Sequence, residues 1–205
     1  MNYKSDGCMK IYLIDTKDLD IERALKCSLF TKEDIDRINR FTFEQSKKEK
    51  IVSTYFIKKY IGEYYLNEHG KPLSNKYFFN VSHSKGMVAF VMDDVPIGID
   101  IELKREITKE LIEYISSPSE LEYIKNEQNF FEIWTNKESL VKADGTGLTG
   151  SIKDIPGLPI NNIKKYKKDI YRSKTIVEND LVITVCRKDT NDFEIELIKD
   201  NFKYE

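Results

Sequence analysis

The sequence predicts an α+β fold of two similar lobes, each a small antiparallel sheet packed with helices. Two short apolar runs, at residues 77–82 and 87–92, flank a turn, and isoleucines alternate with other residues over 96–102; both patterns are typical of strands. Apolar residues recur at helical spacing over 44–66. Helices followed by a hairpin occur on each side of Pro96, which indicates a pseudo-twofold relation between residues 1–95 and 96–205.

The composition is that of a globular protein. The chain has 205 residues, of which 40% are hydrophobic and 33% charged, enough for one substantial domain or two small ones. The net charge of −2 argues against a general nucleic-acid binder, and no apolar run approaches membrane-spanning length. Residues 1–10 lack the apolar core of a signal peptide. Three widely spaced cysteines without metal-ligand spacing predict reduced thiols in a cytoplasmic protein: Cys8, Cys27 and Cys186.

The first half is predicted to contain a strand, three helices and a hairpin. Residues 9–14 form the strand and 18–28 a short helix. Thr31 and Asp34 have capping-box spacing, which predicts a helix from there to about Arg40. The longer helix, 44–66, carries several lysines, most of them expected on a solvated face, with an anion site served by one or two as the alternative: Lys47, Lys48, Lys50, Lys58 and Lys59. A turn at 69–72 precedes the hairpin.

The second half is predicted to follow the strand at 96–102 with helices and then strands. Short helices are expected at 108–115 and 118–125, and a stronger helix at about 128–142 that ends before the glycines of 145–147. Residues 151–162 are rich in Pro, Gly and Asn, which predicts loops. Strand-like runs follow at 169–171, 181–186 and 193–197.

The strand at 96–102 has two distinct faces. Its isoleucines belong in a core, whereas Asp100 and Glu102 share the other face with Gly98. Two adjacent carboxylates repel unless a cation lies between them. Oxygen ligands beside the space left by a glycine describe half of a Mg²⁺ site with room for a phosphate-bearing substrate. An ordinary amphipathic strand with solvated acids is the alternative.

The helix at 128–142 offers a second set of charged side chains. Trp134, Glu138 and Lys142 are four residues apart and share one helix face. A glutamate and a lysine at this spacing also stabilise an exposed helix, by about 0.2–0.5 kcal/mol. Because Trp134 lies on the same face, we expect that face to be partly covered. Glu138 is then a third candidate metal ligand, and Lys142 a partner for phosphate.

Several segments together resemble the motifs of 4′-phosphopantetheinyl transferases of the surfactin-synthetase-activating type. Residues 97–102 read Ile-Gly-Ile-Asp-Ile-Glu, and residues 134–142 read Trp-Thr-Asn-Lys-Glu-Ser-Leu-Val-Lys. The segments 69–72, 79–84 and 145–148 resemble the family's glycine-lysine-proline turn, its hairpin and the glycines after its helix. In this order and at compatible separations, the motifs are specific to the family.

The resemblance implies a monomeric enzyme with its active site between two lobes. The N-terminal lobe, 1–95, would bind the nucleotide side of coenzyme A, and the C-terminal lobe, 96–205, would carry the metal and catalytic motifs. The implied reaction moves the 4′-phosphopantetheine arm of coenzyme A to a serine of an apo acyl or peptidyl carrier protein and releases 3′,5′-ADP. Mg²⁺ is the implied ion, with Mn²⁺ as a substitute.

The resemblance also assigns roles to individual residues. Asp100, Glu102 and Glu138 would hold the metal. Lys142 would contact phosphate and stabilise the leaving 3′,5′-ADP. Glu138 is favoured as the base for the serine, directly or through a metal-bound water. The implied coenzyme A contacts, besides Lys142, are Arg37, Lys71, Ser82, His83 and Lys137. One departure is that the family's arginine early in the long helix aligns near Glu49.

Some alternatives stay open from the sequence. The rival functions are a Mg²⁺-dependent nucleotide hydrolase and a non-catalytic module that binds coenzyme A or a carrier protein. Carrier proteins of fatty-acid, polyketide, nonribosomal-peptide and siderophore pathways are equally compatible. Residues 103–125 are a candidate carrier-docking surface, with packing into the second lobe as the alternative: Leu111, Ile112, Ile115 and Tyr123.

Overall fold

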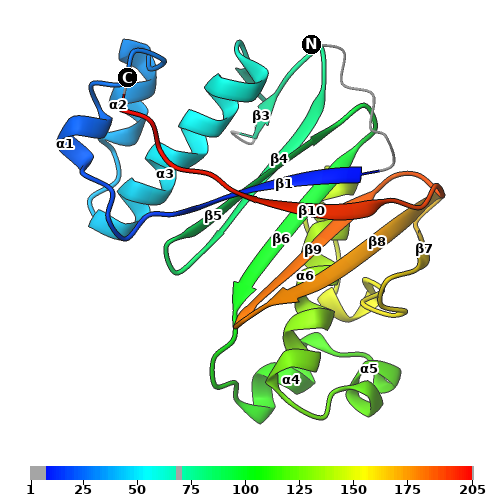
Figure 1. Ribbon diagram of the computed structural model, residues 1–205. Helices are drawn as coiled ribbons and strands as arrows, with labels where there is room; N and C mark the ends of the chain where they lie inside the picture. The colour runs from blue at the N-terminus through cyan, green and yellow to red at the C-terminus, as the bar shows by residue number, and fades with distance from the viewer. Residues whose placement is uncertain (1–7, 68–70, 205) are drawn as a thin grey trace.

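A computed structural model describes residues 8–67 and 71–204, which form two four-stranded sheets and a two-stranded one (Figure 1). The strand order is β10-β1-β5-β4 in the first sheet and β6-β9-β8-β7 in the second. The α+β class is confirmed. No helix in these two ranges is both long enough and apolar enough to cross a bilayer. The first two residues of the turn predicted at 69–72, His69 and Gly70, lie outside the described residues.

The first sheet combines strands from both ends of the chain. β5 (Met87–Asp93) pairs antiparallel with β4 (Phe78–Ser84) and with β1 (Cys8–Asp15). β10 (Glu194–Lys199) pairs parallel with β1, so this sheet is mixed, where the sequence predicted an antiparallel one. β10 also comes from the part of the chain assigned to the C-terminal lobe. The division at 95/96 stays a prediction.

The helices of the first half cover the outer face of this sheet. They are α1 (Ile21–Ala24), α2 (Lys32–Ile38) and α3 (Glu44–Phe56). The Thr31–Asp34 capping box is confirmed at the start of α2. A π-helical turn, Ile57–Ile61, continues α3 and ends at Gly62, whose φ of 81° is costly for other residues. The predicted helix therefore ends early, and its last residues form β2 (Tyr65–Leu66), which pairs with β3 (Pro72–Leu73).

The second half follows the predicted order, with one additional strand. β6 (Ile97–Leu103) leads to α4 (Lys109–Ile115), α5 (Pro118–Tyr123) and α6 (Glu127–Asp144). A short 3-10 turn, Ile152–Asp154, interrupts the predicted loops. The sheet is completed by β7 (Ile163–Tyr166), β8 (Asp169–Glu178) and β9 (Leu181–Arg187). The sequence did not predict β7, because two lysines interrupt its apolar pattern.

The two sheets pack face to face through one apolar core. β6 contributes the three alternating isoleucines, which confirms the predicted inner face of this strand; the core contains Met9, Ile11, Leu13, Ala89, Val91, Ile97, Ile99, Ile101, Leu181, Ile183, Val185 and Phe193. A second core joins the first sheet to α1–α3, and a third joins the second sheet to α6. The layers are therefore helices, sheet, sheet and helix, and β6 lies between the central core and α6.

Candidate active site at the junction of β4, β6 and α6

Polar side chains of β4 connect the edges of the two sheets. Asn80 Oδ1 accepts the backbone N–H of Ile99 at 3.0 Å. The hydroxyls of Ser82 and Ser84 accept the N–H groups of Ile101 at 3.3 Å and Leu103 at 3.2 Å. These side chains satisfy backbone donors at the edge of β6 that would otherwise be buried without partners. The β4 side chains thus fix the position of the strand that carries Asp100 and Glu102.

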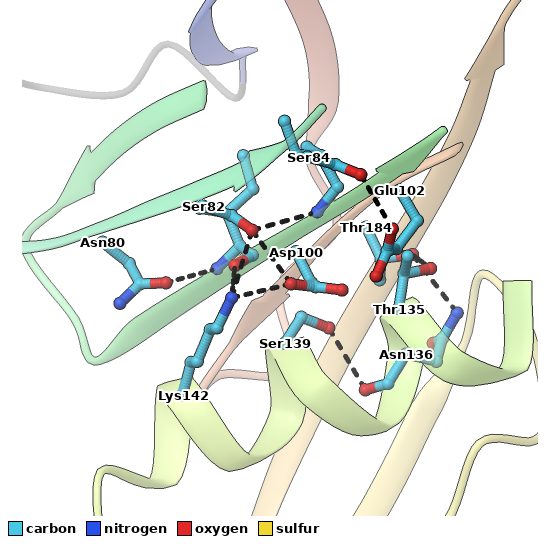
Figure 2. A network of polar contacts seen from close by, with 12 residues as sticks. Asn80, Ser82, Ser84, Asp100, Glu102, Thr135, Asn136, Ser139, Lys142 and Thr184 are labelled. Carbon is cyan, nitrogen blue, oxygen red and sulfur yellow. Dashed lines mark hydrogen bonds and ion pairs between the residues drawn. The ribbon is translucent and has the colours of Figure 1, made fainter. Parts of the chain in front are cut away.

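Asp100 is the most buried acid of the site. Its Oδ1 atom accepts hydrogen bonds from Lys142 Nζ at 2.7 Å and from Ser82 Oγ at 2.9 Å (Figure 2). Its Oδ2 atom is buried and has no hydrogen-bond partner among the described residues. Burial raises the pKa of Asp100, and the positive charge of Lys142 opposes that shift. An unpartnered carboxylate oxygen in this position suits a hard cation such as Mg²⁺.

Gly98 allows α6 to approach β6 closely. A Cβ atom at this position would lie 2.1 Å from the carbonyl oxygen of Ser139 and 2.5 Å from the backbone nitrogen of Ala143. The space beside Gly98 is therefore filled by the backbone of α6, whereas the sequence analysis expected it to be open to a ligand. The glycine has a packing role, and it brings Glu138 and Lys142 to the acidic strand.

Glu138 on α6 is the third acid of the site, and the charges of the other two affect its pKa. The pKa of Glu138 is raised by burial and by the negative charges of Asp100 and Glu102. Glu138 is therefore close enough to Asp100 and Glu102 for their charges to affect it. In the part of the chain that the structure describes, however, no three His, Cys, Asp or Glu side chains are grouped closely enough to hold a metal ion. The metal assignment of these residues stays a prediction.

Both acids of β6 are paired with cationic side chains of the protein itself, Asp100 with Lys142 and Glu102 with Arg105. Lys142 Nζ donates to Asp100, to Ser82 Oγ at 3.1 Å and to the carbonyl oxygen of Ile99 at 3.1 Å. All three of its N–H donors are thus used, so a contact with phosphate requires one of them to exchange. Glu102 Oε2 accepts from Ser84 Oγ and from Arg105 Nη1, both at 2.8 Å.

Two adjoining cavities open beside this junction. Their volumes are about 370 Å³ and 290 Å³, and both are lined by Asn67, Lys71, Pro72, Phe79, Lys142 and Gly145. Lys71 Nζ donates to the carbonyl oxygen of Lys142 at 3.1 Å, so the two lysines lie side by side. Burial and the charge of Lys142 lower the pKa of Lys71. A larger cavity of about 680 Å³ lies between Leu13, Leu103 and Phe202, and none of the predicted site residues lines it.

Ser82 and His83 are neighbours on β4, so they point to opposite faces. Ser82 is 3% exposed, and its hydroxyl is used by Asp100, Ile101 and Lys142. Its predicted contact with a phosphate requires one of these hydrogen bonds to exchange and stays a prediction; in this structure the hydroxyl holds Asp100. The side chain of His83 is 58% exposed, and its Nδ1 lies 3.2 Å from Glu49 Oε2.

Lys137 lies away from the junction of β4, β6 and α6. Its side chain is fully buried, and its Nζ pairs with Glu120 Oε2 at 2.8 Å. The same nitrogen donates to the carbonyl oxygens of Ile115 and Ile152. Lys137 and Lys142 are five residues apart, about 140° around the helix, so they cannot share a face. Lys137 anchors α6 to the segment around α5, and its complete burial leaves no surface for the predicted contact with coenzyme A.

Arg37 lies among the helices of the first half. Its Nη2 atom contacts Asp34 Oδ1 and the Tyr64 hydroxyl, and Lys58 pairs with the other oxygen of Asp34 at 2.9 Å. These hydrogen bonds hold the pKa of Asp34 well below its usual range, despite burial. The role of Arg37 toward coenzyme A stays a prediction.

Asn80, Ser84 and Arg105 contact the acidic strand, and none of them was predicted from the sequence as a site residue. The first two carried a signal, because residues 80, 82 and 84 of the predicted strand are all small and polar and share one face. α6 is also fixed on its sheet-facing side, by buried hydroxyl and amide groups that contact β8 and β9. Asn136 Nδ2 donates to Thr175 Oγ1 at 2.8 Å, and the hydroxyls of Thr135 and Thr184 lie 2.7 Å apart. Figure 2 shows Thr135, Asn136 and Thr184 beside the acidic cluster.

Comparisons with known proteins agree with the motifs. Residues 96–195 match the 4′-phosphopantetheinyl transferase superfamily. The chain is 32% identical over 163 residues to 4′-phosphopantetheinyl transferase ffp of Bacillus subtilis, covering 69% of this chain and 72% of the relative. It is 29% identical to Sfp of Bacillus subtilis strain 168, with the same coverage. It is 35% identical over 103 residues to a holo-[acyl-carrier-protein] synthase of Aliarcobacter butzleri, covering 43% and 85%. This chain belongs to the 4′-phosphopantetheinyl transferase superfamily.

Proposed function

We propose that this protein transfers the 4′-phosphopantetheine arm of coenzyme A to a serine of an apo acyl or peptidyl carrier protein and releases 3′,5′-ADP. Family membership supports the activity. The structural observation that carries the proposal is the meeting of Asp100 and Glu102 on β6 with Glu138 and Lys142 on α6, next to cavities lined by Lys71.

Asp100, Glu102 and Glu138 are the proposed Mg²⁺ ligands, with Mn²⁺ as a substitute. The fit rests on the buried, unpartnered Oδ2 of Asp100 and on a donor set made only of carboxylate oxygens. When bound, the ion offsets the charge of the pyrophosphate and acts as a Lewis acid.

The residues of the chain account for the remaining chemistry. The serine oxygen forms a bond to the β-phosphorus of coenzyme A, the bond from that phosphorus to the bridging oxygen breaks, and 3′,5′-ADP leaves. Lys142 offsets the negative charge that grows on the bridging oxygen. Glu138 is assigned as the group that accepts the proton of the serine hydroxyl, directly or through a water molecule.

The cavities beside Lys142 are the proposed nucleotide site. Lys71 lines both cavities and supplies a cation that is already partly desolvated. His83 and Arg37 are further proposed contacts for the phosphates of coenzyme A. Arg37 would have to exchange its contact with Asp34 for the ligand.

The proposed carrier-docking surface lies on α4 and α5. Leu111, Tyr114 and Leu121 are exposed there. Ile115 is fully buried in the core of the second lobe, and Ile112 and Tyr123 pack against that core, so these three belong to packing. We further propose a cytoplasmic monomer.

The test is mass spectrometry of several apo carrier proteins incubated with the protein, coenzyme A and Mg²⁺. The expected result is a phosphopantetheine mass on the carrier, in an amount that depends on Asp100. Phosphopantetheine released into solution would indicate a nucleotide hydrolase instead. Calorimetric binding of coenzyme A or carrier protein without any product would indicate a non-catalytic module.

A further inference from the structure

Glu102 is paired with an arginine from its own loop. Arg105 follows β6 by two residues and donates from Nη1 to Glu102 Oε2 at 2.8 Å and to the carbonyl oxygen of Leu103 at 3.3 Å. Its guanidinium carbon lies 4.9 Å from the centre of the Phe131 ring on α6. The side chain of Arg105 is 39% exposed and that of Glu102 is 17% exposed. The cation therefore lies at the solvent side of the acidic cluster.

We propose that Arg105 is an internal counter-ion that neutralises Glu102 until a divalent cation binds, and that it thereby sets the affinity of the site for metal. The inference rests on the proposed function, because it takes Glu102 as a metal ligand. Three interacting carboxylates repel one another without a cation. Lys142 offsets Asp100, and Arg105 offsets Glu102. Both cations lower the negative potential that attracts a metal ion.

Arg105 does not provide the orientation of Glu102. Ser84 Oγ donates to the same Oε2 atom at 2.8 Å, and Ser84 is fixed by its bond from the Leu103 N–H. The carboxylate therefore stays directed by β4 when the guanidinium leaves. Loss of Arg105 removes a competing charge and keeps the ligand in place, so we expect metal affinity to rise.

The displaced side chain has an acidic environment nearby. Arg105 also lines a polar cavity of about 460 Å³, together with Lys104, Glu106, Asn126, Glu127, Gln128 and Asp180. The three acids of this lining offer the guanidinium alternative partners. Arg105 can thus exchange Glu102 for this cavity without entering an apolar environment.

The expected effect is moderate, because the ion pair is partly exposed. Removing a partly exposed ion pair of this kind corresponds to about a fivefold change in the binding constant of the metal ion. The Arg105→Gln variant should bind Mn²⁺ about fivefold more tightly than the unmodified protein. Arg105→Lys keeps the charge and should bind like the unmodified protein. Lys109→Gln is the matched control, because Lys109 is an exposed cation that pairs with Glu113 on α4.

The test measures bound Mn²⁺ from the loss of the free-ion electron paramagnetic resonance signal, with Mg²⁺ as competitor and without carrier protein. Thermal unfolding without metal verifies that each variant is folded. Tighter Mn²⁺ binding by Arg105→Gln alone supports the inference. Equal affinity of that variant and the unmodified protein overturns the inference and leaves the metal site intact. Absence of Mn²⁺ binding in both overturns the inference together with the metal assignment.

Discussion

Replacing Gly98 by alanine should separate α6 from the acidic strand. The added Cβ would lie 2.1 Å from the Ser139 carbonyl oxygen and 2.5 Å from the Ala143 nitrogen, and both are backbone atoms that cannot rotate away. Excess volume in a packed core costs about 1–3 kcal/mol. Relief of the clash requires α6 to shift by about 1 Å, and a misplacement of that size can cost about 100-fold in rate.

Urea unfolding and transfer of phosphopantetheine to an apo carrier protein test this prediction. We expect Gly98→Ala to lose about 2 kcal/mol of unfolding free energy and about 100-fold in transfer rate. Ile97→Val is the matched control on the same strand; it should lose about 1 kcal/mol by removal of one methyl group and keep its activity. A Gly98→Ala variant with unchanged stability and rate would refute the close approach of α6 to β6.

Three further predictions follow from the buried charges. Asp100→Asn should abolish transfer while its free energy of unfolding at pH 7 stays equal or rises. Burial raises the pKa of Asp100, so the acid loses stability relative to a neutral amide as the pH rises above the pKa of the unfolded carboxyl. A marked loss of stability of this variant in urea unfolding would contradict the reasoning. Lys137→Met should lose about 3 kcal/mol of unfolding free energy, because the charge of Glu120 is left buried without a counter-ion. The double variant Lys137→Met/Glu120→Gln should recover part of that loss. A raised KM for coenzyme A in the folded double variant would instead indicate that Lys137 contacts the ligand. Burial lowers the pKa of Lys164 to about 8, so as the pH rises the folded state loses this proton before the unfolded state does. The unfolding free energy of the unmodified protein should therefore rise between about pH 8 and pH 10, by up to about 3 kcal/mol relative to Lys164→Met. Parallel pH profiles of unfolding free energy for the two proteins would count against the burial of Lys164.

Local sequence patterns predicted much of the fold and part of the site. The alternation around Asp100 placed the isoleucines of β6 in the core and its acids on the opposite face. Spacing on α6 placed Glu138 and Lys142 on the face toward β6, and the Thr31–Asp34 capping box marked the start of α2. The role that the resemblance implied for Lys137 does not agree with its burial, because a position in a motif does not state which side of the helix meets a ligand.

The sequence by itself determined the family, the order of most helices and strands, and the acids and lysine of the proposed active site. These properties depend on residue type and on spacing within a few residues, which the backbone periods of helix and strand convert into faces. Only the tertiary structure decided the parallel pairing of β10 with β1, the burial of Ser82 and the pairing of Glu102 with Arg105. Each of these features depends on contacts between residues that are distant in sequence or on how charges are paired once they are buried. The local periods of helix and strand do not specify such contacts.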